Sequence, residues 1–400
     1  MSAIVTYARN RISLTITRSL AKRGIKVITA DSIYPAMACF SKYSSGHFTY
    51  PSPMLYPKEF ISELIRQAKR HEVQVLIPAH EESYIIAKYK DILEKEGLKV
   101  IVSDYETIMK LQNKAICAEV AQKLGIPIPH TWSPDNIDEV TEIAREASYP
   151  LVIKLRKGRG SIGLQYVYNS ASLITKYNKT ITEFDLKQGN YPLIQEYIPG
   201  NGVGVSMLFN KGNLLAKFTH LRLKELPITG GTSVERISIR CPEAEDYAEK
   251  LLRYFSWHGV AMAEFKIHND SKKPYLLEVN PRFWGSLNEA VCAGVDFPYL
   301  LYKLALGEPI EEKGNYKLGV KTVWFYGYLK ALSSYLMTSR RWEALRVLLA
   351  PFDKNTYYDD LSLSDPLPTI VEPMFALKQL VTKGRLTFET DEELIKNVPF

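Results

Sequence analysis

The chain has 400 residues, enough for about two to three domains and for a large core that needs no disulfide or metal staple. Hydrophobic residues make up 46% and charged residues 24%, an ordinary globular composition that excludes disordered, collagen-like and coiled-coil chains. The net charge of +7 is mild and suits an anionic ligand better than a nucleic-acid track.

The sequence shows no pattern typical of a membrane span, a signal peptide or paired cysteines. No apolar run approaches the roughly 20 residues that span a bilayer, so we expect no stable membrane insertion. The first residues carry Arg9, Arg11 and Arg18 after only a brief apolar stretch, which does not resemble a signal peptide. The four cysteines are scattered without metal-type pairing, which favours reduced thiols and a cytoplasmic protein.

Strands and helices alternate over the first hundred residues. We expect strands at residues 3–7, 25–29, 73–77 and 99–102, and helices at residues 11–23, 57–71 and 82–96. This rhythm predicts a parallel sheet with right-handed crossovers, a Rossmann-like domain over residues 1–104. Its first turn, at residues 8–10, lacks G-x-G-x-x-G, so no dinucleotide site is predicted.

The chain changes character after a helix expected at residues 105–124. Short β-rich segments then dominate, with helices expected at residues 137–147, 170–179, 243–257 and 290–307, which indicates an α+β region. The last ninety residues hold a basic, aromatic segment at 321–349, a polar acidic loop and a final helix. We therefore expect three domains, at residues 1–104, 105–310 and 311–400, the last of them helical.

Two strands, VAMAEFKIH and YLLEVNPR, are joined by NDSKKP and form a predicted hairpin. Centred on Ser271, the hairpin places Glu264 opposite Glu278, with Asn280 and Arg282 on the same face as Glu278. Two like charges directly opposite are destabilising unless a cation lies between them. Glutamate and asparagine oxygens suit Mg²⁺, and an arginine fork there can hold a phosphate or carboxylate. The alternative is a solvated hairpin face with unrelated charges.

A glycine-rich loop follows a basic strand in LVIKLRKGRGSIGLQYV. The strand ends in Lys154 and Arg156, and the loop residues of interest are Gly158, Gly160, Ser161 and Gly163. Glycines let backbone N–H groups approach phosphate oxygens. The loop is not a Walker A motif, which needs G-x-x-x-x-G-K-[ST] opening a helix. An ordinary hairpin loop made soluble by basic residues is the alternative.

A third stretch, PLIQEYIPG, is a predicted strand that stops at Pro199 and Gly200. Backbone groups at such an end can recognise adenine through one carbonyl and one N–H. A plain strand and turn is the alternative.

In this order the features resemble the ATP-grasp superfamily, in its carbamoyl-phosphate-synthase-like branch of carboxylate–amine or carboxylate–thiol ligases. The resemblance covers about residues 3–310 and is most specific between Lys114 and Arg282. It implies an ATP-grasp fold after the Rossmann-like domain, with a mobile lid at about residues 127–194. It implies nucleotide contacts by Lys114, by Lys154 and by the glycine-rich loop, adenine recognition by Gln195, Glu196, Tyr197 and Ile198, metal ligands in Glu264, Glu278 and Asn280, and a catalytic Arg282.

Candidate substrate contacts are fewer and less specific. The stretch HLRLKELPITGGTSVERIS resembles a loop of the same branch, and we single out His220, Arg222 and Gly231 in it. The alternatives are a structural histidine and an arginine in a local ion pair. Glu81 follows a predicted parallel strand, where open sheets place ligands, although an acid is also favoured where a helix begins. No clear ribose-binding acid follows residues 195–198.

The resemblance implies an ATP-dependent ligase with ATP and Mg²⁺ or Mn²⁺ as cofactors. A carboxylate would become an acyl phosphate and then join an amine or thiol, with release of ADP and phosphate. The expected partners are these small molecules and no nucleic acid, and a homodimer is compatible with them. The alternatives are a non-catalytic ATP-binding regulator, a phosphotransferase on the same fold, and a membrane-surface protein that uses residues 321–349. The sequence names neither the acid nor the nucleophile.

Overall fold

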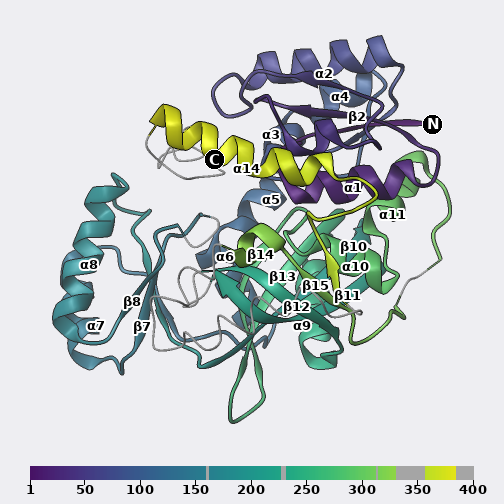
Figure 1. Ribbon diagram of the computed structural model, residues 1–400. Coiled ribbons are helices and arrows are strands. Elements are labelled where there is room, and N and C mark those ends of the chain that lie inside the picture. The colour runs from purple at the N-terminus through teal and green to yellow at the C-terminus, as the bar shows by residue number, and fades with distance from the viewer. Residues whose placement is uncertain (159–161, 227–230, 312–313, 330–355, 384–400) are drawn as a thin grey trace.

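The computed structural model describes residues 1–158, 162–226, 231–311, 314–329 and 356–383 (Figure 1). Three sheets build this part of the chain: one of five strands, one of seven and one of four. The mixed α/β architecture with a parallel N-terminal sheet confirms the predicted fold class.

The N-terminal sheet is parallel, with the strand order β3-β2-β1-β4-β5. Its strands are β1 (Ser2–Val5), β2 (Lys26–Asp31), β3 (Gly46–Thr49), β4 (Val75–Ile77) and β5 (Lys99–Val100), and its helices are α1 (Arg11–Ala21), η1 (Met37–Phe40), α2 (Pro57–His71), α3 (Glu82–Lys88) and α4 (Lys90–Lys95). The sequence prediction lacks β3 and joins α3 to α4, whereas Tyr89 breaks that helix with φ −110° and ψ 17°. The strand order reverses between β1 and β4, so the loops after these two strands flank one crevice.

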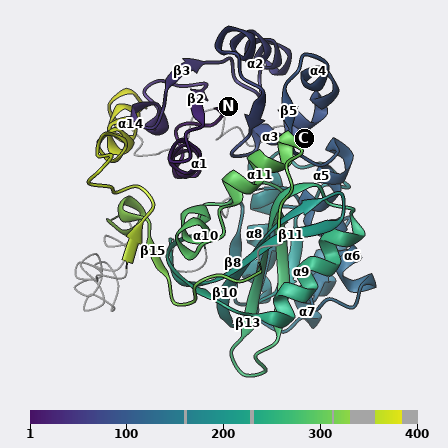
Figure 2. The ribbon, with the colours of Figure 1, turned by 90° about the vertical axis from the view of Figure 1, so that its right-hand side faces the viewer.

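Helix α1 is buried on nearly all sides and connects the parallel sheet to the rest of the protein. Asn10 caps its N-terminus by accepting a hydrogen bond from the Ile12 amide. The helix packs on β2 and also on α10 (Leu287–Ala293) and α11 (Phe297–Leu306), which lie beside it in Figure 2. Ser19 donates a 2.6 Å hydrogen bond to Asp296 across this contact. The loop before α1 is therefore held at a fixed place relative to the residues that follow the hairpin.

The seven-stranded sheet has the order β14-β13-β10-β11-β12-β15-β16. Its strands are β10 (Gly200–Asn210), β11 (Asn213–Leu226), β12 (Thr232–Ile239), β13 (Gly259–His268), β14 (Pro274–Asn280), β15 (Lys321–Val323) and β16 (Thr356–Tyr358), and α9 (Pro242–Tyr254) packs against β10 and β11. All neighbours pair antiparallel except β15 and β16. The C-terminal region, which we expected to be helical, therefore adds two strands to this sheet.

The C-terminal helix α14 (Leu367–Lys383) packs on η1 of the N-terminal domain (Figure 1). The chain thus returns from the large sheet to the carboxyl edge of the parallel sheet. The basic, aromatic segment expected at residues 321–349 lies mostly outside the described residues. Within the part of the chain that the structure describes, no helix is both long and apolar enough to cross a membrane.

The four-stranded sheet forms a separate layer with its own core (Figure 1). It consists of β6 (Thr131–Trp132), β7 (Leu151–Lys154), β8 (Gln165–Val167) and β9 (Leu193–Glu196), covered by α7 (Ile137–Glu146) and α8 (Ser170–Glu183). Its buried side chains, among them Val140, Ile153 and Tyr177, pack on one another rather than on the other two sheets. This layer corresponds to the expected lid, whose motion remains a prediction.

The single helix expected at residues 105–124 is two helices, α5 (Tyr105–Gln112) and α6 (Lys114–Lys123). Asn113 separates them with extended backbone (φ −74°, ψ 108°), and its side chain caps α6 by accepting from the Ala115 amide. Asparagine favours such a cap because its short side chain competes for backbone N–H groups. Lys114 is consequently the first residue of α6, where its amide donates to the carbonyl of Arg156 at the end of the lid strand.

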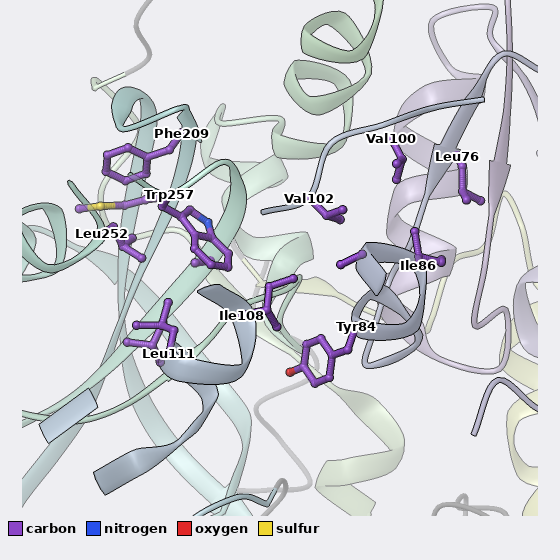
Figure 3. Close-up of a cluster of buried hydrophobic side chains, with 14 of the residues drawn as sticks. Leu76, Tyr84, Ile86, Val100, Val102, Ile108, Leu111, Phe209, Leu252 and Trp257 are labelled. Atoms are coloured by element: carbon purple, nitrogen blue, oxygen red, sulfur yellow. The ribbon is translucent and has the colours of Figure 1, made fainter. Parts of the chain in front are cut away.

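One continuous hydrophobic cluster joins the parallel sheet, α5 and the large sheet (Figure 3). Leu76 and Val100 of the parallel sheet, Ile108 of α5 and Trp257 before β13 all belong to it. Each is at most 1% exposed. Shared burial of this kind favours two layers that stay fixed relative to each other, against which the separately packed four-stranded layer can move.

Candidate active site

The hairpin of β13 and β14 places two glutamates side by side. Glu264 pairs with Glu278 and Met262 with Asn280, as the sequence predicts. Beyond Glu264 a bulge shifts the register, because Phe265 pairs with Leu276 and Leu277 is left as the additional residue. The face that carries both carboxylates and Asn280 borders a cavity of about 400 Å³.

Cations and an amide surround the two carboxylates. Arg222 lies 2.6 Å from Oε2 of Glu264, and Asn280 donates a 2.8 Å hydrogen bond to Oε1 of the same residue. Lys114 lies 3.1 Å from Oε2 of Glu278. Burial raises the pKa of Glu264 despite Arg222. Burial alone would also raise the pKa of Glu278, but Lys114 and Lys154 hold it below its usual value.

Lys154 extends from the lid strand β7 into the same cavity. Its ammonium donates a 2.6 Å hydrogen bond to Oε1 of Gln195. Burial lowers the pKa of Lys154 to about 8, and Glu278 partly opposes that effect. Lys114 donates a 3.2 Å hydrogen bond to the carbonyl of Gly158, so it bridges the hairpin and the start of the glycine-rich loop. Lys114 thus contacts Glu278 directly, and Lys154, from another layer, acts on it electrostatically.

Residues 195–198 connect the lid to the large sheet and line the cavity. The Gln195 side chain is held between Lys154 and the hydroxyl of Thr131. The amide of Glu196 donates to the carbonyl of His130, and Ile198 is buried. A strand end with such fixed neighbours suits the recognition of a flat base, which remains the predicted role of this segment.

Most residues singled out in the sequence come together around this one cavity. Those that line it are Lys114, Lys154, Gly158, Gln195, Glu196, Tyr197, Ile198, His220, Arg222, Gly231, Glu264, Glu278, Asn280 and Arg282. Glu81 and Gly163 are not in its lining. Gly163 packs on Leu155 with φ +70°, and Gly160 and Ser161 lie outside the described residues.

Arg282 is held by two contacts, and one of its N–H groups has no partner in the described residues. One terminal nitrogen donates to the carbonyl of Phe283 at 2.8 Å, and the other lies 4.0 Å from Oε1 of Glu81. Its Nε is buried and has no hydrogen-bond partner in the described residues. Glu81, which we predicted to contact substrate, therefore lies beside the expected catalytic arginine and does not line the cavity itself.

The remaining predicted substrate residues have structural partners. His220 is buried, contacts Oγ of Ser286 at 3.3 Å, and fills the space left by Gly204, where a Cβ would lie 2.3 Å from the ring. Burial lowers the pKa of His220 well below its usual value, so the ring is neutral. Arg222 pairs with Glu225 as well as with Glu264. Arg222 therefore contacts the predicted metal ligand Glu264 rather than facing solvent.

Sequence reasoning missed the part of the cavity wall that comes from the N- and C-terminal regions. The residues that were missed are Tyr7, Arg9 and Arg11, which follow β1, Trp324, which follows β15, and Glu372, which lies on α14. The crevice rule for open parallel sheets could have indicated the residues after β1, because the strand order reverses there. No local motif marks the two C-terminal residues.

The first turn also shows why the parallel sheet is unsuited to a dinucleotide. Asp31 ends β2, the place where such folds use an acid to hold a ribose. Here the Arg9 side chain donates hydrogen bonds to both carboxylate oxygens of Asp31. Tyr7 has a left-handed backbone (φ 58°) and stacks on His80 with ring centroids 4.6 Å apart. Asp31 is thus not free to hold a ribose, and side chains from the two loops line the crevice.

No group of three or more His, Cys, Asp and Glu residues that could hold a metal ion occurs in the described ranges. The hairpin instead offers two carboxylates and an amide oxygen. These are hard donors of the kind that Mg²⁺ prefers, and the like-charged pair gains from a cation between its members. The donor set therefore fits a magnesium ion, with Lys114 and Arg222 now supplying the compensating charge.

Two family models match the chain. Residues 113–200 match the carbamoyl-phosphate synthase L chain, ATP binding domain, and residues 190–327 match ATP-grasp in the biosynthetic pathway with Ter operon. The chain is 24% identical over 310 residues to the carbamoyl phosphate synthase large chain of Methanobrevibacter smithii, which covers 74% of this chain but 28% of that one. It is also 24% identical over 331 residues to the biotin carboxylase of Pseudomonas aeruginosa, covering 78% and 71%.

Solved structures share the fold. A biotin carboxylase complex from Campylobacter jejuni superposes with a TM-score of 0.66 at 19% identity, covering 80% of this chain and 74% of that one. N5-carboxyaminoimidazole synthetase from Staphylococcus aureus gives a TM-score of 0.61 at 16% identity, covering 80% of each. With the glutamate pair and the two lysines around one cleft, these matches define an ATP-grasp protein. The chain belongs to the ATP-grasp superfamily, in its carbamoyl-phosphate-synthase-like branch.

Proposed function

We propose that this protein is an ATP-dependent ligase that activates a carboxylate as an acyl phosphate and joins it to an amine. ADP and phosphate would be the other products. The observation that carries the proposal is the cross-strand pair of Glu264 and Glu278, with Asn280 beside it and Lys114 and Lys154 directed at it. The chain spans only 28% and 21% of the first two carbamoyl phosphate synthase large chains that it matches, so their whole reaction is not transferred to it.

Magnesium, held by Glu264, Glu278 and Asn280, would neutralise the charge of the nucleotide phosphates. Lys114 and Lys154 would bind phosphate oxygens after nucleotide displaces their present partners, Glu278 and Gln195. Residues 195–198 would orient the base. Because Lys154 comes from the lid and Lys114 from α6, phosphate binding by both would draw the lid onto the large sheet.

Arg282 is the residue that we assign to the reacting carboxylate and acyl phosphate. Its side chain is 10% exposed and borders the cavity, and its buried Nε–H has no partner in the described residues. A preorganised donor in such a site is worth more than in water, because it needs no reorganisation as charge develops. The neighbouring Glu81 at 4.0 Å helps to keep the guanidinium in place.

Removal of Glu278 tests the proposal. Phosphate release is measured with Mg-ATP, pooled carboxylic acids and pooled amines for the parent, Glu278→Ala and Asp270→Ala. Asp270 is an exposed residue in the turn of the same hairpin and serves as the matched control. We expect Glu278→Ala to lose at least a hundredfold in rate while Asp270→Ala keeps the parental rate, since a lost metal ligand is far costlier than a lost surface charge.

Two outcomes would contradict the proposal. If Glu278→Ala turns over ATP like the parent, the assignment of the metal ligands is wrong. If ADP forms with an acid alone and amines never change its rate or consume the acid, the protein is a phosphotransferase rather than a ligase.

A further inference from the structure

The cleft continues beyond Arg282 to a wall made by the C-terminal segment. Trp324 and Glu372 line this end of the cavity. Glu372 lies on α14, outside both matched family regions, which end at residue 327. No function has so far been assigned to this segment in the ligase described above.

Glu372 is one of two adjacent buried acids and lines the cavity. Its side chain is 6% exposed. Trp324 donates a 3.0 Å hydrogen bond from its indole N–H to Oε1, which fixes the carboxylate. No N–H or hydroxyl group of the described residues donates to Oε2, and the side-chain hydrogen bond between Glu372 and Asp360 requires a proton shared by the two acids. Because two adjacent buried carboxyl groups can both ionise only when a cation lies beside them, a cationic group on a bound ligand would replace this shared proton.

The charged neighbours of Glu372 are Arg11 and Asp360. The Nε of Arg11 donates to the carbonyl of Gly285 at 2.9 Å and lies 3.3 Å from Asp359, and its guanidinium stacks over the ring of Trp324. Asp360, the other carboxyl beside Glu372, accepts from three backbone amides. Burial and Asp360 raise the pKa of Glu372 to about 8. Acidic groups therefore outnumber cations at this end of the cleft.

Aromatic and apolar side chains line the same cavity as this carboxyl group. Tyr7 and His80 are stacked on each other, and Trp284 and Met37 line the same cavity. Arg9, which also lines it, has both carboxylate oxygens of Asp31 as partners. A ligand in this cavity meets flat apolar surfaces and the paired acids Glu372 and Asp360.

We propose that this end of the cleft binds the nucleophile as a primary amine on an apolar or aromatic body, with its ammonium donating to Oε2 of Glu372. The identification of this amine as the nucleophile rests on the proposed ligase function, whereas amine binding itself does not. Trp324 is a positioning residue, because it acts by holding the carboxylate. An ammonium is the ligand group that supplies both several donors and the missing positive charge.

Binding of matched amines and alcohols tests this site without turnover. The full chain, saturated with Mg-ADP, is titrated by calorimetry at pH 8.5 with 2-phenylethylamine and 2-phenylethanol, and with butylamine and butanol. In at least one pair we expect the amine to bind at least tenfold more tightly than the alcohol. Glu372→Gln should weaken that amine at least tenfold and leave the alcohol unchanged, because it keeps shape and removes charge.

Two further variants control the test. Glu245→Gln removes an equally buried carboxylate that is not in the cavity lining and should keep the parental preference. Trp324→Phe should weaken amine binding less than Glu372→Gln does. If Glu372→Gln fails to bind Mg-ADP, the Trp324→Phe variant provides a second test. Equal binding of amine and alcohol in every pair by the parent overturns the proposal, as does full amine preference in both cleft variants. Failure of the phosphate-release screen alone would count against the ligase and not against this site.

Discussion

The pKa of Lys154 leads to a measurable proton uptake when nucleotide binds. Burial lowers this pKa to about 8, so the ammonium is about half protonated at pH 8 and about nine-tenths protonated at pH 7. Phosphate oxygens in contact with the lysine favour the charged form. Binding of ADP, with divalent metal removed by chelation, should then take up about half a proton at pH 8 and about a tenth at pH 7. The affinity should fall about tenfold between pH 7 and pH 9.

Calorimetric titration with ADP in two buffers of different ionisation enthalpy measures this uptake directly. Lys154→Met should abolish it, while Lys187→Met, which removes an exposed lysine of the same layer, should leave it intact. An uptake near zero for the parent at pH 8 would refute the reasoning. Uptake that persists in Lys154→Met would assign the proton to another group.

Three further predictions concern single side chains. Arg282→Lys should lower kcat by about tenfold or more with little change in ATP affinity, because lysine lacks the planar guanidinium that arginine has. Measurement of kcat, ATP affinity and melting temperature on one sample tests this. A lower melting temperature with unchanged kcat would show a structural role. The pKa of Glu372 is raised to about 8 by burial and by Asp360, so the stability that its proton contributes is fully present below pH 4.5 and is lost as pH rises through 8. Between pH 6 and pH 9 this loss is about 3 kcal/mol, at about 1.4 kcal/mol for each pH unit below 8, and Glu372→Gln should remove it, as measured by urea unfolding at those two pH values. Gly163→Ala should lower the free energy of unfolding by about 1–2 kcal/mol, because φ is +70° and a Cβ would lie 2.7 Å from Leu155; unchanged urea unfolding would refute this.

Local patterns predicted the centre of the candidate site. The alternation of β13 and β14 and the turn between them lie within about twenty residues, so Glu264 and Glu278 can be paired from the sequence alone. The bulge at Phe265 was not predictable, because it depends on how the sheet twists rather than on side-chain type. It leaves the glutamate pair in place, since the shift lies on the turn side of Glu264.

Helix breaks and distant contacts could not be predicted in the same way. The sequence around Asn113 favours a continuous helix, and the break appears only because the asparagine side chain caps the next helix against the lid. Arg11 and Trp324 are more than 300 residues apart in sequence and meet at 4.0 Å. Such a contact depends on the topology of the whole chain, which hydrophobic periodicity does not encode.

The return of the C-terminal segment to the first helix has a consequence for how the protein matures. Arg18 on α1 binds Asp365, 347 positions later, and the buried Arg236 binds Asp359. The amine end of the cleft therefore cannot assemble during synthesis until residue 372 has left the ribosome, although the parallel sheet and the glutamate hairpin are complete about ninety residues earlier. Contacts this distant in sequence also form slowly. A nascent chain should thus gain its nucleotide site before its substrate site.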